Sequence, residues 1–292
     1  MPWEIDYALL TFTQLRKSKY YLPEDVNITI DSVLNLSTNL IDWEESTLPK
    51  EYFIKKYETL STLLDVYIHH PKVYQGDDLY GHLDLQRDAI SEETDYYINI
   101  CPDTYFSEHL LHYLVQAARQ IPNKYFVLVP EICKMWDTSW DSITHPMYKD
   151  VPHLTWSEAT DVFDVDHYLH TSGDQVTVSP VEHLKWAGWF DLYNKNYYED
   201  LARIPQEWKG YGGHDYYGMQ VAHYARHIGL DFEQYKLENQ IAFEYSVGPI
   251  NSLCEYYREF ISIKNPSAQR ESFAAATPRY VEERIQQLTN LL

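Results

Sequence analysis

The feature that most constrains the fold is an alternation of strand-like and helix-like patterns over the first 130 residues. Short runs with the length and composition of strands occur at 5–10, 26–31, 66–68, 96–101 and 125–129. Residues 49–64 and 107–121 carry apolar side chains at helical spacing. Strands that alternate with helices predict an α/β layer with a largely parallel central sheet.

In a sheet of this kind, ligands bind beyond the carboxyl ends of the strands. Asp31 comes at the end of the second strand pattern, and Asp103 follows the pattern at 96–101. We therefore expect the functional acids to lie at this edge of the sheet.

The remainder of the chain divides into three parts. Residues 134–182 are aromatic, acidic and poor in periodicity, which indicates a loop or lid region around a site. A helix is expected before Gly229, a natural helix stop. We predict one domain over 1–245 and a C-terminal helical extension over 246–292, whose last helix follows Pro278.

The charge of the chain excludes two classes of partner. It has 44 acidic and 23 basic residues, a formal net charge of −21, and no basic block. Such a surface repels nucleic acid and anionic lipid. A phosphate-bearing ligand must therefore be bound by a metal ion or by a few positioned arginines. No run approaches the about 20 apolar residues that span a membrane.

The N-terminus and the cysteines indicate the compartment. The chain starts MPWEIDYALL, which lacks the pattern of a signal peptide. Its three cysteines are widely spaced, which favours a reducing environment, so we expect a cytoplasmic protein. The 27 tyrosines and 8 tryptophans suit both a core and the stacking of sugars, and the core is the commoner use.

The segment 207–218, EWKGYGGHDYYG, carries the strongest local signal. Gly212 and Gly213 let the backbone approach a ligand closely. Asp215 then falls in the first turn of a predicted helix, where the helix dipole favours its ionised form. An ionised carboxylate beside a hydroxyl group suits a general base, although a glycine turn with Asp215 as a helix cap is the commoner meaning of such a segment.

The order of the motifs resembles the GT-A class of nucleotide-sugar glycosyltransferases. GHLDLQRDAI precedes the strand YYINI and then CPDTYF, and LKWAGWFDLYNKNYYEDL later precedes EWKGYGGHDYYG. The late part is most similar to the β-1,4-galactosyltransferase type. The ordered pattern spans 5–230, and the match is close at 81–106 and 184–230. The resemblance implies a GT-A-like, Rossmann-type fold.

The resemblance implies a metal site on Asp103. The family's Asp-x-Asp motif, which holds Mn²⁺ or Mg²⁺ on the donor diphosphate, reads Cys101-Pro102-Asp103 here. A carboxylate suits such a cation, whereas cysteine is a soft ligand that suits it poorly. Asp164-Val165-Asp166 is a second, lower-ranked candidate, and a plain turn at Pro102-Asp103 is the alternative.

The resemblance also implies how the substrates bind. The donor, a UDP- or GDP-sugar, would be held by Thr11, Thr13, Asp31, Arg87 and Asp103. The acceptor, a glycan or another hydroxyl compound, would be held by Trp186, Gly188, Tyr211, Gly212, Gly213 and His214. Independently of the resemblance, Trp136 and Trp140 lie beside acids in MWDTSWD, which suits the binding of an acceptor sugar, and buried tryptophans with solvated acids are an equal alternative. Asp215 would be the catalytic base, with His214 at the family's glutamate position.

The sequence therefore predicts a glycosyltransferase that moves a sugar from a nucleotide diphosphate to a hydroxyl group, with inversion. One alternative is a noncatalytic glycan-binding or assembly protein. Another is a sugar nucleotidyltransferase, which would require a glycine-rich, basic loop after the first strand, where TFTQLRKSK has no glycine. The donor base, the sugar, the acceptor and the oligomeric state are not encoded in any recognisable motif.

Overall fold

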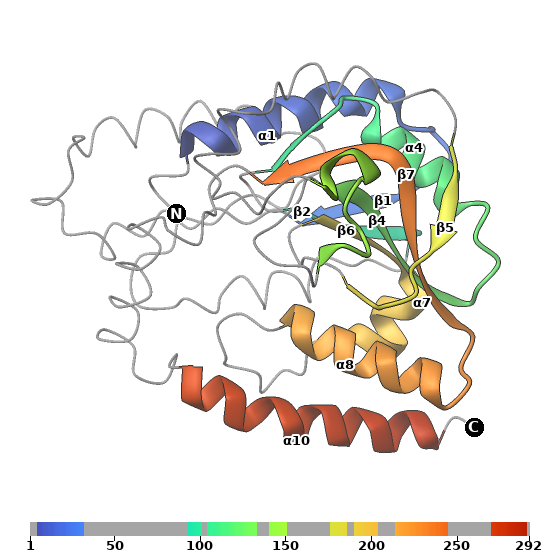
Figure 1. The fold of residues 1–292 in the computed structure, drawn as a ribbon. Helices are drawn as coiled ribbons and strands as arrows, with labels where there is room; N and C mark the ends of the chain where they lie inside the picture. The colour runs from blue at the N-terminus through green and yellow to red at the C-terminus, as the bar shows by residue number, and fades with distance from the viewer. Residues whose placement is uncertain are drawn as a thin grey trace, which may run out of the picture.

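The computed structural model describes residues 5–31, 93–100, 104–132, 140–150, 176–185, 190–203, 214–244 and 270–290 (Figure 1). The helical elements are α1 (Ile5–Ser18), η2 (Lys19–Tyr21), α4 (Leu110–Ala118), η4 (Pro146–Tyr148), α7 (Lys195–Tyr197), η5 (Tyr198–Ala202), α8 (His214–His227) and α10 (Arg270–Thr289). The strands are β1 (Ile28–Asp31), β2 (Tyr96–Ile100), β3 (Thr104–Phe106), β4 (Tyr125–Ile132), β5 (Val178–Pro180), β6 (Phe190–Asn194) and β7 (Phe232–Glu244).

The strands form one mixed sheet in the order β1-β2-β6-β4-β7-β3, with β5 also paired to β7. Among the described strands, only the β1–β2 and β4–β7 pairs are parallel, and the other pairs are antiparallel. The prediction of a mostly parallel, GT-A-like Rossmann-type sheet is therefore wrong. The alternation in the early sequence could not reveal that β6, from late in the chain, lies antiparallel between β2 and β4.

The first predicted strand, at 5–10, is also wrong, because α1 extends through these residues from Ile5 to Ser18. The buried side chains in the second half of α1 are Thr11, Phe12, Leu15 and Ser18. Their spacing of three and four residues places them on one face of a helix. A short apolar run is ambiguous between strand and helix, and here the apolar period beyond it decides for the helix.

The helices cover both sides of the sheet. Figure 1 shows α1 and α4 on one side and α8 and α10 on the other. The predicted core face of the 107–121 helix is confirmed, since Leu110, Leu111 and Leu114 of α4 are fully buried. None of the helices in the described part of the chain is long and apolar enough to span a membrane.

Strand β4 is buried along its whole length. It was expected to end before Pro130, yet it continues through this proline to Ile132. Pro130 pairs with Leu237 of β7, and the next residue, Glu131, pairs with Ile241. The register shift shows why proline is accepted in a central strand, since it stands at an irregularity of the ladder.

A row of aromatic rings packs across the sheet. Tyr97 and Tyr193 have ring centroids 5.9 Å apart, Tyr193 and Tyr197 5.6 Å, and Tyr197 and Phe232 5.3 Å. The Tyr197 hydroxyl donates to the carbonyl oxygen of Gly218 in α8 at 3.3 Å, and burial raises the pKa of Tyr197 well above its usual value. These tyrosines are core residues, as expected for most of the aromatic side chains.

The C-terminal helix α10 packs against α8. It begins at Arg270, so the expected start after Pro278 is wrong, and the proline lies inside the helix. Leu288 is fully buried, and the hydroxyl groups of Tyr224 and Thr289 are hydrogen-bonded at 3.1 Å. The predicted elements at 49–64 and 66–68 lie outside the described residues.

The packing of α10 can be tested with Leu288→Ala. We expect it to lower the free energy of unfolding by about 2–5 kcal/mol, because it removes a fully buried side chain and leaves a cavity. The matched control is Gln287→Ala at an exposed neighbouring position. Urea unfolding monitored by circular dichroism measures both, and equal stabilities of the two variants would contradict the packing of α10 on α8.

Candidate functional site

The carboxyl ends of β1, β2, β4 and β7 lie at the same edge of the sheet. β1 is parallel to β2, β6 is antiparallel to both β2 and β4, and β4 is parallel to β7, so these strands share one direction. Asp31 is the last residue of β1 and pairs with Asn99 of β2. The expectation that Asp31 reaches this edge is confirmed, although it lies within the strand ladder.

Helix α8 starts on the side of the sheet where these strands end (Figure 1). α8 packs against β7 and is joined to it by a turn in which Gly229 has φ +83°, so the predicted helix stop is confirmed. Because α8 ends where β7 begins, α8 starts near the edge at which β7 ends (Figure 1). His214 is the first residue of α8, and Asp215 therefore lies in its first turn, as predicted.

The start of a helix has two properties that matter here. Its first backbone N–H groups have no partner within the helix, and the helix dipole is positive at this end. Both stabilise a negative charge near Asp215 and near any anionic substrate group beside it. The position of Asp215 in the chain is therefore suited to an ionised carboxylate, and its role as the base remains a prediction.

Arg284 of α10 fixes the residues on either side of the segment 204–213. Its Nε donates to the hydroxyl of Tyr217, in the first turns of α8, at 3.2 Å. Its Nη atoms donate to the carbonyl oxygens of Asp200 at 3.5 Å and Arg203 at 3.3 Å. Burial raises the pKa of Tyr217, with the charge of Arg284 opposing it, which keeps the hydroxyl protonated. One arginine thus ties the end of η5 to the beginning of α8.

Thr11 and Thr13 lie in helix α1 instead of a loop after a strand. Thr11 is buried, and its hydroxyl donates to the carbonyl oxygen of Thr104 at 2.8 Å, which holds α1 against the start of β3. Thr13 is exposed. Since both were assigned to the donor because they seemed to follow the first strand, that reason no longer applies.

A buried charged cluster on β4 and β7 was missed by the sequence analysis. The Glu131 side chain is only 2% exposed, and its Oε1 accepts from Nζ of Lys236 at 2.8 Å. Its Oε2 accepts from the backbone N–H of Asn239 at 2.8 Å and lies 3.7 Å from Nε2 of His145. The signal in the sequence was an acid within the otherwise apolar strand YFVLVPEI.

The geometry of this cluster indicates a structural role. Glu131 fills the irregularity where β7 detours between Leu237 and Ile241, and Asn239 adopts a positive φ of 60° there. Nδ1 of His145 accepts from the backbone N–H of Met147 at 3.3 Å, so the ring proton is on Nε2, facing Glu131. Each charged group of the cluster faces another member of the cluster, which fits a structural role.

The metal prediction is not met by any group in the described part of the chain, where no three metal-ligating side chains gather. Both oxygens of Glu131 accept hydrogen bonds from protein groups, one from Lys236 and one from the backbone of Asn239. Asp103 lies outside the described residues, as do Arg87, Trp136, Trp186, Gly188, Tyr211, Gly212, Gly213 and the second candidate Asp164-Val165-Asp166. Their assignments stay predictions.

Trp140, one of the predicted acceptor residues, is largely buried. Its side chain belongs to the core, with the residue only 8% exposed, and Nζ of Lys185 lies 4.3 Å from its ring centroid. Its carbonyl oxygen accepts from the hydroxyl of Thr144 at 2.9 Å. A ring covered in this way packs against protein, and a sugar would have to displace Lys185 to stack on that face.

Comparisons with known proteins do not place the chain in a family. No protein-family model matches it, and no curated protein matches it. A solved structure of the inositol-1-phosphate CTP transferase from T. maritima is similar over 82% of this chain and 97% of its own, with 10% sequence identity and a TM-score of 0.35. A likeness of that extent supports no conclusion about the reaction.

The Glu131 cluster can be tested with Lys236→Met. We expect the free energy of unfolding to fall by about 3–5 kcal/mol, because the substitution leaves a buried carboxylate without its cation. Lys17→Met, which removes an exposed lysine, is the matched control and should change stability by less than about 0.5 kcal/mol. Adding Glu131→Gln to Lys236→Met should recover part of the loss. If the two single variants unfold at the same urea concentration, the cluster does not stabilise the bulge.

Proposed function

We propose that the protein is a transferase whose substrate carries a nucleotide, and that it moves a sugar from a nucleotide-diphosphate sugar to a hydroxyl acceptor. The supporting observation is the placement of Asp215 in the first turn of α8, on the side of the sheet where four strands end, two residues after Gly213 in the sequence. Glycine residues allow a ligand to approach the backbone closely, and the positive end of a helix favours an ionised carboxylate nearby.

The proposed chemistry needs one base. Asp215 takes the proton from the acceptor hydroxyl, and the acceptor oxygen forms a bond to the anomeric carbon. The bond from that carbon to the diphosphate breaks, and the nucleoside diphosphate departs with the electron pair. Attack opposite to the leaving group inverts the anomeric centre. The N–H groups at the start of α8 favour negative charge near them, which helps the developing charge.

Nucleotidyl transfer to a sugar phosphate is the second candidate. It was set aside because TFTQLRKSK, taken as the loop after the first strand, has no glycine. These residues form α1, and the first strand of the sheet is β1. The residues after β1, SVLNLSTNL, also contain no glycine and no basic side chain, so the objection still applies. The reaction named for the T. maritima enzyme is of this kind.

Asp215→Asn tests the proposal. The purified protein is incubated with UDP-, GDP- and CMP-sugars, with and without Mn²⁺, and the release of free nucleotide is measured. We expect the wild type to turn over one donor and Asp215→Asn to lose about 10²-fold or more of that rate while donor affinity is kept, because only the base is removed. Asp150→Asn, at an exposed position, is the matched control.

A parallel assay separates the candidates. The protein is supplied with each nucleoside triphosphate and a sugar phosphate, and pyrophosphate is measured. Pyrophosphate release without donor turnover would select nucleotidyl transfer. Binding of glycan without turnover in either assay would select the noncatalytic alternative. Donor turnover that survives Asp215→Asn unchanged would contradict the assignment of the base.

A further inference from the structure

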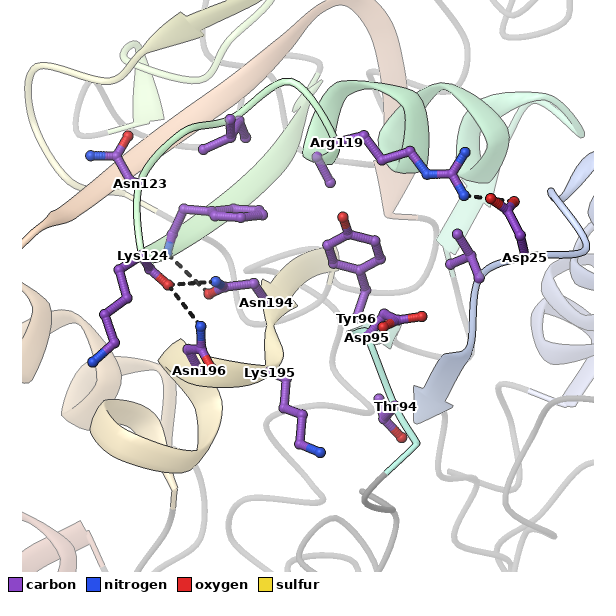
Figure 2. A pocket seen from close by; sticks show the side chains of 14 residues that line it. Asp25, Thr94, Asp95, Tyr96, Arg119, Asn123, Lys124, Asn194, Lys195 and Asn196 are labelled. Carbon is purple, nitrogen blue, oxygen red and sulfur yellow. Dashed lines mark hydrogen bonds and ion pairs between the residues drawn. The ribbon is translucent and has the colours of Figure 1, made fainter.

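An open groove lies at the opposite edge of the sheet from Asp215, where β2 and β4 begin and β6 ends. Its volume is about 550 Å³, within the range of small-molecule sites. Tyr96 of β2, Asn194 of β6 and Phe126 of β4 lie in one row across neighbouring strands and form its floor. The end of α4 and the start of α7 form its sides (Figure 2).

The residues that line the groove carry a small excess of basic groups. The lining contains the three basic residues Arg119, Lys124 and Lys195 and the two acidic residues Asp25 and Asp95, a formal charge of +1. Two of these basic groups also face an acid just outside the lining, Lys124 near Asp200 at 3.9 Å and Lys195 near Glu199 at 3.8 Å. The whole chain carries −21. A strongly acidic protein needs a local excess of basic groups in order to bind a phosphate group.

Tyr96 and Arg119 supply donors within the groove. Figure 2 shows Tyr96 standing between Asn194 and Arg119. The hydroxyl of Tyr96 makes no hydrogen bond with any residue that the structure describes. Burial raises the pKa of Tyr96, with the charge of Arg119 opposing it, so this hydroxyl stays protonated at neutral pH and can donate.

The floor of the groove is held in place by hydrogen bonds. Oδ1 of Asn194 accepts from the backbone N–H groups of Phe126 at 3.1 Å and Tyr197 at 3.2 Å. Its Nδ2 donates to the carbonyl oxygen of Lys124 at 2.7 Å. Tyr96 and Phe126 add apolar ring surface, with their centroids 6.4 Å apart. A fixed polar floor beside ring surface suits a ligand with a flat or apolar part.

We propose that this groove binds a phosphorylated small molecule, whose phosphate accepts from Arg119 and from the hydroxyl of Tyr96 while its remaining part lies over the Tyr96 and Phe126 rings. Lys195 adds positive charge from the start of α7. The site is separate from the edge at which Asp215 lies, because β2 and β4 begin here and end there. It therefore does not depend on the proposed function.

Asp25 competes with such a ligand. Nη2 of Arg119 donates to Oδ1 of Asp25 at 2.7 Å, and the Asp25 side chain is 76% exposed. An exposed ion pair contributes little stability, and a guanidinium has further N–H groups for a phosphate. Removal of the Asp25 charge should therefore strengthen phosphate binding, an effect opposite in sign to simple damage of the groove.

The test uses phenyl phosphate, which combines a ring with a phosphate group, in ligand-detected NMR titrations of the full-length protein at constant ionic strength. We expect saturable binding to the wild type and much weaker binding of phenol. Arg119→Gln should raise the Kd about tenfold, because it removes a charged donor, and Tyr96→Phe should raise it severalfold. Asp25→Asn should lower it.

Arg279→Gln is the matched control, because Arg279 is an arginine with a 62% exposed side chain on α10, and it should leave the Kd within about twofold. Circular dichroism of each variant checks the fold. The proposal fails if the wild type shows no saturable binding. It also fails if Arg119→Gln and Arg279→Gln weaken binding equally, since that result would indicate general attraction of an anion to the protein.

Discussion

The pairing of β4 with β7 is the constraint on which the rest of the structure depends. β4 is buried throughout and lies between β6 and β7, and β7 also carries β3 and β5. The long strand β7 can follow β4 past Pro130 only by leaving the ladder between Leu237 and Ile241. The buried carboxylate of Glu131, held by Lys236 and the N–H of Asn239, stabilises that detour.

The same pairing sets the position of α8, and through α8 the candidate active site. The chain enters β7 directly after α8 and the Gly229 turn, so the direction of β7 determines which edge receives the first turn of α8. α10 then fixes α8 from the outside through Leu288 and Arg284. The groove lined by Tyr96, Arg119 and Asn194 lies at the other edge and is formed by the opposite ends of the same central strands. One sheet therefore supports two separate polar regions.

The elements that the sequence predicted well are those with a complete local signal. α4 shows a full apolar stripe, β2 a buried run of β-formers, and α8 an amphipathic pattern that ends at Gly229. α1 was mistaken for a strand because its first residues form a short apolar run. β7 was not recognised from the sequence. Glu238, Asn239 and Gln240 lie in its middle, at the register shift, and these polar residues interrupt the alternation that marks a strand.

By itself, the sequence determined where the chain is helical or extended over its most periodic segments, the position of Asp215 in a helical first turn, and the acidity that requires a phosphate to be held by local groups. These are properties of neighbouring residues and of composition. The tertiary structure alone decided the antiparallel placement of β6, the burial of Glu131 and the gathering of Arg119 with Tyr96. Each of these joins residues far apart in the chain, and their contact depends on the packing of the whole sheet, which no local pattern encodes.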